Sequence, residues 1–125
     1  MLPLNFSEQE EVIIRDSVTA MEESHLRIYS DPEKMEYIKR ETEARNNVKN
    51  FDMSITENEI AKRLEAFSAI RKNPKYLIQK FDDLMLDQLF VAISKRYNKK
   101  NPHLMGLIYK ILNAREMGFT FDRQN

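Results

Sequence analysis

The segment Asn73–Tyr97, NPKYLIQKFDDLMLDQLFVAISKRY, decides the fold class of this 125-residue chain. It opens with an asparagine N-cap followed by proline, which is a strong helix start because proline has no N–H to leave unpaired in the first turn. Apolar residues then recur at helical spacing and cover much of the circumference of the expected helix. A helix that is apolar nearly all round is surrounded by other helices. The segment therefore predicts a central helix over residues 74–97 in an all-α protein.

Four further helix starts flank this segment. Two repeat the pair of N-cap and proline, and two fit a capping box, in which an N-cap hydroxyl is followed three residues later by glutamate. These starts are Asp31-Pro32, Asn101-Pro102, Ser7 with Glu10, and Thr56 with Glu59. Helical apolar spacing follows each of them, so helices are predicted over residues 8–29, 32–49, 56–72 and 102–117 as well. Gly118 fits the position that follows the last of these helices.

The expected architecture is a compact bundle of about five helices in one domain, residues 1–125, because this length is typical of a single domain. A possible subdivision falls at residues 50–54, between an N-terminal helical hairpin (1–50) and a C-terminal three-helix unit (54–125). The chain has only two glycines, which leaves few of the tight turns that hairpins need. No segment alternates apolar and polar residues as a strand does.

Composition removes several classes of function. The chain has no cysteine, so disulfide, thiolate–zinc, iron–sulfur and cysteine-nucleophile chemistry are excluded. No phosphate-binding loop, nucleophile elbow or dinucleotide turn occurs. Glu22 and His25 form one E-x-x-H pair, which is half of a di-metal bundle motif, but His25 lies on an apolar face. We therefore predict no catalytic, cofactor or metal site. Without signal peptide or long apolar run, a cytoplasmic protein with no membrane partner is expected.

One face of the first predicted helix has the spacing of a partner-binding surface. Its apolar positions step by four, three, four and three residues, as in a coiled-coil seam. The seam consists of Ile14, Val18, Met21, His25 and Ile28. It predicts a non-enzymatic interaction module (an adaptor, inhibitor or assembly factor) that binds another protein or a second copy of itself. A short chain rich in Lys, Asn, Ile and Met is also compatible with a phage or other accessory protein.

Charge is unevenly distributed although the net charge is zero. Residues 1–37 hold nine acids and three bases, and residues 71–103 hold eight bases and three acids. The alternative function is therefore a nucleic-acid-associated helical regulator that contacts phosphates through basic clusters. These clusters are Arg71, Lys72 and Lys75, at the start of the expected central helix, and Lys95, Arg96, Lys99 and Lys100, at its end. Pairing of the first cluster with the acidic N-terminal helix would explain it without a ligand.

A helix-turn-helix unit is a further route to DNA binding. Residues 59–64, EIAKRL, resemble the first helix of such units, in which an alanine and a leucine pack on the recognition helix. The small residue expected in the turn is missing, and the next helix break comes only at Asn73-Pro74. Only half of this pattern is therefore present.

Overall fold

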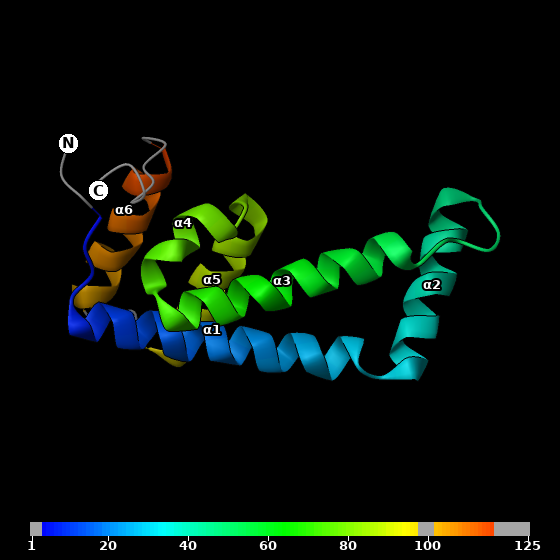
Figure 1. Cartoon of the computed structure of the whole chain (residues 1–125), viewed down its shortest axis with the longest axis horizontal. Coiled ribbons are helices and arrows are strands. Elements are labelled where there is room, and N and C mark those ends of the chain that lie inside the picture. The colour runs from blue at the N-terminus through cyan, green and yellow to red at the C-terminus, as the bar shows by residue number, and fades with distance from the viewer. Residues whose placement is uncertain (1–3, 98–101, 117–125) are drawn as a thin grey trace.

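The computed structural model describes residues 4–97 and 102–116, and every regular element in those ranges is a helix (Figure 1). The all-α prediction is thus confirmed for this part of the chain. The elements are α1 (Glu8–Tyr29), α2 (Pro32–Asn46), α3 (Ser54–Lys72), a 3-10 helix (Pro74–Tyr76), α4 (Leu77–Lys80), α5 (Asp83–Arg96) and α6 (Pro102–Glu116). The described residues hold six α-helices, one more than the expected number, because one predicted helix is broken.

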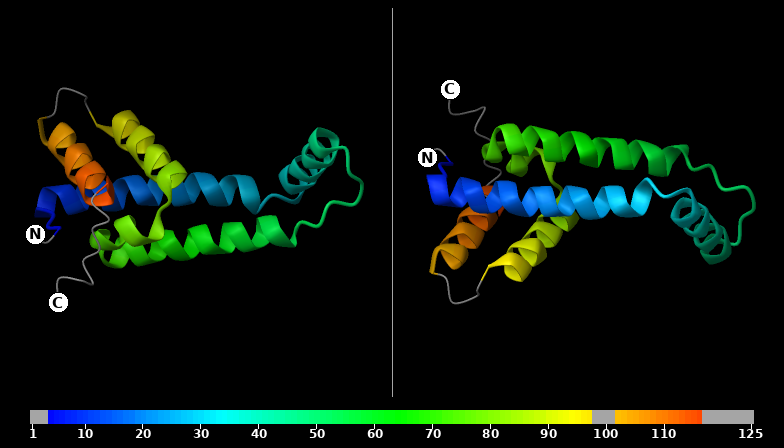
Figure 2. Two further views of the ribbon diagram at one scale, coloured as in Figure 1. Left: turned by 90° about the horizontal axis from the view of Figure 1, so that it is seen from above. Right: turned by 90° about the horizontal axis from the view of Figure 1, so that it is seen from below.

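Helix α1 organises the fold. It runs antiparallel to α3 on one flank, while α5 and α6 lie on the other flank (Figure 2). Its first half packs into a core that α3, α4, α5 and α6 complete. The side chains with essentially no exposed surface include Ile14, Val18, Phe67, Ile70, Leu77, Phe81, Leu89, Ile93, Leu107 and Ile111.

The prediction of one central helix over residues 74–97 is wrong. Phe81 is extended (φ −98°, ψ 132°), and the Asp82 side chain accepts a hydrogen bond of 2.8 Å from the Met85 N–H as the N-cap of α5. The break has a packing reason. A single straight helix would carry apolar residues around most of its circumference, whereas two helices at an angle each bury one face, Leu77 in α4 and Leu89 in α5.

Three of the helix starts form as predicted. The Ser7 hydroxyl accepts from the Glu10 N–H at 3.1 Å and the Glu10 carboxylate accepts from the Ser7 N–H at 2.8 Å, which completes the capping box. Asp31 accepts from the N–H two residues on, and Asn73 does the same at the start of the 3-10 helix. Asn101 lies outside the described residues, as do the predicted last residue of α6, Met117, and the following Gly118.

The predicted capping box at Thr56 is wrong. Helix α3 begins two residues earlier, at Ser54, and its N-cap Met53 makes no side-chain cap. Asp52 accepts a 2.9 Å hydrogen bond from the Ser54 N–H, and this turn starts the helix before Thr56 is reached. The rest of α3 is continuous to Lys72, so it does not contain the break that a helix-turn-helix unit would need.

Burial divides the molecule into two regions, which we call the body (residues 4–18, 66–97 and 102–116) and the arm (residues 19–65). No residue from Thr19 to Glu65 is buried. The arm consists of the second half of α1, all of α2 and the first half of α3, which extend away from the body (Figure 1). The expected boundary at residues 50–54 falls inside the arm.

Helix α2 does not form a hairpin with α1, as the sequence predicted, but crosses the far ends of α1 and α3 (Figure 1). None of its residues is buried, because its composition offers no continuous apolar face to pack. The helix ends at Asn46 rather than at the predicted Lys49, since Asn47 takes a left-handed conformation (φ 52°) that asparagine tolerates better than most residues.

Candidate functional site

The structure divides the predicted seam of α1 between the two regions. Ile14 and Val18 are fully buried in the body, so they have no surface to offer a partner. Met21 packs against the edge of the core, His25 is half-buried, and Ile28 is 40% exposed. Only the last three of these side chains therefore remain accessible, at the point where the arm leaves the body.

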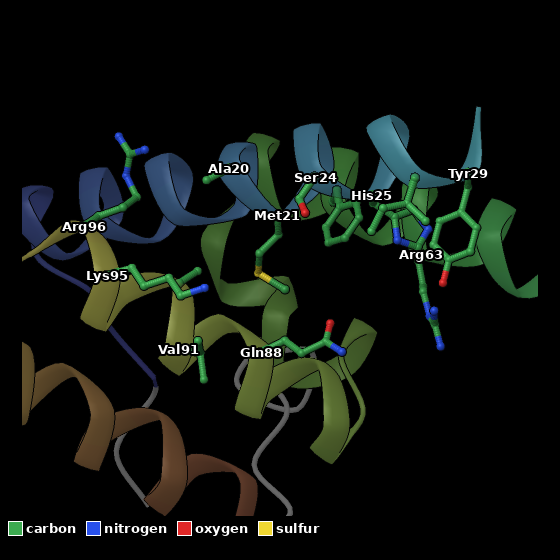
Figure 3. A pocket seen from close by; sticks show the side chains of 13 residues that line it. Ala20, Met21, Ser24, His25, Tyr29, Arg63, Gln88, Val91, Lys95 and Arg96 are labelled. Atoms are coloured by element: carbon green, nitrogen blue, oxygen red, sulfur yellow. The ribbon is translucent and has the colours of Figure 1, made fainter. Parts of the chain in front are cut away.

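These three accessible side chains line a groove of about 530 Å³, bounded by α1, α3 and α5 (Figure 3). Val91, which is 53% exposed, lines the groove from α5, and Phe67 of α3 is a buried part of its wall. The groove exists because the body ends here: α5 crosses α1 at an angle, whereas α1 and α3 continue into the arm (Figure 2). Its apolar surface is continuous with the core but accessible to solvent.

Every charged side chain that lines this groove is positive. They are Arg63 from α3 and Lys95 and Arg96 from the last turn of α5, and no aspartate or glutamate lines the groove. Lys95 and Arg96 lie toward one end, Arg63 lies toward the other end near Tyr29, and Met21 lies between them (Figure 3). None of these three cations takes part in the ion pairs within residues 4–97 and 102–116.

His25 forms part of the wall of the groove. The centre of its ring lies 4.5 Å from that of the tilted Tyr29 ring, and it meets the Phe67 ring edge-on at 5.7 Å. Burial lowers the pKa of His25, and the positive charge of Arg63 lowers it further, so the imidazole is neutral at pH 7. Its Nε2 atom is buried without a hydrogen-bond partner among the described residues. His25 therefore acts in this wall as an aromatic side chain.

The first residue of the E-x-x-H pair, Glu22, has its partner outside the groove. The Glu22 carboxylate forms an ion pair with the Arg71 guanidinium across the α1–α3 interface. Among the residues that the structure describes, no three His, Asp or Glu side chains come together in a way that would hold a metal ion.

The two basic clusters approach α1 from different sides. Arg71 is tied to α1 by the Glu22 ion pair and by its carbonyl, which accepts from the Arg15 Nε at 2.9 Å. Lys95 instead lines the groove, to which α1 contributes Ala20. Glu22 and Ala20 point about 160° apart around α1 at roughly 3.6 residues per turn. The internal pairing left open above thus accounts for Arg71, and the two clusters do not join into one surface.

Within the described ranges, the structure does not bring the remaining basic residues together as the predicted anion-binding clusters. Lys72 is exposed at the end of α3, and Lys75 is half-buried in the 3-10 helix. The long helix begins at Asp83 instead of Pro74, so this cluster does not flank a long helix N-terminus with an appreciable dipole. Lys99 and Lys100 lie outside the described residues.

Sequence reasoning missed the contributions of α3 and α5 to the groove. Arg63 and Phe67 are spaced i, i+4, and Gln88, Val91 and Lys95 are spaced i, i+3, i+7, so each set shares one helix face. This spacing was the available signal. It does not show which helices face each other, because the position of α5 depends on the break at Phe81.

Comparisons with protein-family models, with curated proteins and with solved structures find no match for this chain. Among the described helices, none is long and apolar enough to cross a membrane. The inference of function therefore depends on the groove alone.

Proposed function

We propose that this chain is a non-enzymatic interaction module, an adaptor, inhibitor or assembly factor, that binds another protein through the groove. The observation that carries the proposal is the accessible part of the α1 seam, Met21, His25 and Ile28, next to a well-packed core. Apolar surface that stays exposed on a folded domain commonly marks an interaction site. A groove between helices is also a common binding site for a helix of a partner protein.

The lining of the groove favours binding over catalysis. It contains no carboxylate that would act as a general base and no cysteine that would act as a nucleophile. Its one histidine is packed between two aromatic rings, and its Nε2 atom is buried. A histidine in this position is suited to packing in the groove wall and poorly suited to proton transfer.

Site-specific photo-crosslinking in the producing cells tests this proposal. A photoreactive amino acid replaces exposed Ser24 in the groove, and in a control it replaces Leu84, which is 54% exposed on α5 and does not line the groove. We expect Ser24, but not Leu84, to crosslink to a defined protein, and we expect Ile28→Asp to abolish that product. Equal products at the two positions, or none at Ser24, would contradict the proposal. Ile14→Asp is unsuitable, because a buried charge there would unfold the body.

The second candidate is a nucleic-acid-associated regulator, favoured by the three groove cations that have no carboxylate partner among the described residues. It predicts binding whose salt dependence weakens by about one unit of slope for each cation neutralised. Fluorescence anisotropy with labelled single- and double-stranded DNA, at several salt concentrations, measures this slope. Binding that is absent or independent of salt would eliminate this candidate.

A further inference from the structure

We propose that the occupant of the groove is an acidic amphipathic helix of a partner protein, with its apolar face on Met21, Ile28 and Val91 and carboxylates at both ends. This inference rests on the proposed function and specifies its partner. It follows from three features of the groove: its length, the position of its charges and the composition of the helices that this chain itself could supply.

The length of the groove suits a short helical segment. Along α1 its lining extends from Ala20 to Tyr29. At about 1.5 Å per residue, this is roughly 13 Å, or two and a half helical turns. A partner helix that follows this direction would place apolar side chains at i, i+3, i+4 and i+7 on the floor. Met21 suits such a floor, because its flexible thioether adapts to different partners.

The charges select an acidic partner. Arg63 lies toward one end of the groove, while Lys95 and Arg96 lie toward the other (Figure 3). Within the described residues, none of these three cations forms an ion pair with a carboxylate of this chain. Glutamates near both ends of a partner helix would meet them, and lysines there would be repelled. Complementarity of this kind increases the association rate and suppresses wrong partners.

The apolar floor favours a protein over a nucleic acid. A phosphate backbone would meet the cations but would gain nothing from Met21, Ile28 and Val91. An amphipathic helix uses both parts of the lining. The groove therefore matches a helix better than it matches a duplex, whose contacts are mainly polar.

A second copy of this chain is a poor occupant. Helix α2 carries equal numbers of acidic and basic residues, four of each. Helix α6 has one glutamate in its described range, Glu116, and carries Lys110 and Arg115 as well. Neither helix combines an apolar stripe with carboxylates at both ends, so the occupant is assigned to another protein.

Peptide binding in solution tests the proposal. The acidic probe is a fluorescein-labelled helical peptide of about 15 residues, with leucines at i, i+3, i+4 and i+7 and glutamates near both ends. The matched probe has lysine in place of every glutamate. We expect the acidic probe to bind the full chain at least about tenfold more tightly, and the difference to shrink at high salt. Equal affinities for the two probes would overturn the proposal.

Charge-reversal variants locate the binding. Arg63→Glu and Lys95→Glu are each expected to weaken the acidic probe by about tenfold or more, because each turns an attraction into a repulsion. Lys72→Glu is the matched control, since it makes the same charge change at an exposed position outside the groove lining. Circular dichroism confirms that all three variants are folded. An equal loss in Lys72→Glu would show a general charge effect and overturn the assignment.

The crosslinking and peptide experiments test the proposed function and the proposed partner class separately. If Ser24 crosslinks to a protein but no acidic probe binds, the partner class is wrong and the interaction module stands. If light scattering shows a dimer that Ile28→Asp dissociates, the occupant is a second copy and the proposal is overturned.

Discussion

The body and the arm share helices α1 and α3 but are stabilised by different interactions. Helix α1 shows the contrast within one element: Ile14, in its first half, has no exposed surface, whereas Ile28, in its second half, is 40% exposed. The two isoleucines occupy the same seam in the sequence. The difference teaches that a regular apolar seam can serve the core at one end and remain accessible at the other.

The arm depends on local interactions where the body depends on burial. Within α2, Arg40 pairs with Glu36 at 3.3 Å and Arg45 with Glu41 at 3.9 Å, and both pairs are exposed. Exposed pairs of this kind contribute about 0.3–0.5 kcal/mol each. The body is further tied together by Lys110, whose Nζ lies 2.7 Å from the carboxylate of the buried Glu10. We therefore expect the body to determine global stability.

Truncating the two isoleucines to alanine should show the largest difference between the body and the arm. Ile14→Ala should lower the free energy of unfolding by about 2–5 kcal/mol, because it leaves a cavity in a closed core. Ile28→Ala removes a half-exposed side chain and should cost less than about 1 kcal/mol. Urea unfolding of both variants measures the difference. Similar losses at the two positions would break the distinction between body and arm.

The two capping boxes of the sequence extend the comparison to local structure. Ser7→Ala removes a cap that forms at the edge of the body, and it should cost about 1 kcal/mol. Thr56→Ala lies in the arm at a position where no cap forms, and it should change stability by less than about 0.5 kcal/mol. Thermal unfolding by circular dichroism compares the two. A loss at Thr56 as large as that at Ser7 would place the start of α3 at Thr56 after all.

Gly106 offers a stabilising change in the body. It lies inside α6, and a methyl group added there would meet nothing within 4 Å. Alanine costs less conformational entropy in a helix, so Gly106→Ala should raise the free energy of unfolding by about 0.5–1 kcal/mol. Urea unfolding tests this, and destabilisation by Gly106→Ala would show that α6 is less open than described.

His25 joins the two regions, and its titration should have the smallest effect. Burial, followed by the charge of Arg63, lowers its pKa below the ordinary value of 6.5. The unfolded chain then binds a proton more readily than the folded chain, so stability should fall as pH drops below about 6.5. Unfolding of the parent and of His25→Gln at pH 7 and pH 5 measures this.

The His25→Gln variant should lose less stability than the parent between these two pH values. Glu10 does not interfere. Burial raises the pKa of Glu10, but its hydrogen bonds to Lys110 and Ser7 lower it by more, so the pKa in the folded chain is below 4.5. The stability that Glu10 contributes is therefore lost only below about pH 4.5. Identical losses in parent and variant would show that His25 does not titrate in this way.

The sequence predicted helices well where a local signal sets their ends. Helix α1 has the predicted bounds because Ser7 caps its start and Asp31-Pro32 begins the next helix. The break at Phe81 was missed because a helical apolar pattern continues through it. Asp82 is an ordinary N-cap residue, but only the gain in burial of two separate helices makes the chain use it.

The groove was predictable only in part. Met21, His25 and Ile28 were identified from their spacing in α1, and Lys95 and Arg96 from their charge. Their proximity depends on how α5 crosses α1, which no local pattern encodes. Burial of Ile14 and Val18 likewise depends on helices that lie far away in the sequence.

Hydrogen exchange of the free chain, followed by mass spectrometry, tests the division between body and arm most directly. Amides in α2 should exchange at least about tenfold faster than those in α5, because the arm opens without unfolding the body. This result would leave the groove beside Met21 accessible to a partner. Equal protection of α2 and α5 would contradict the account, since it would mean that the arm is held by contacts as extensive as those of the core.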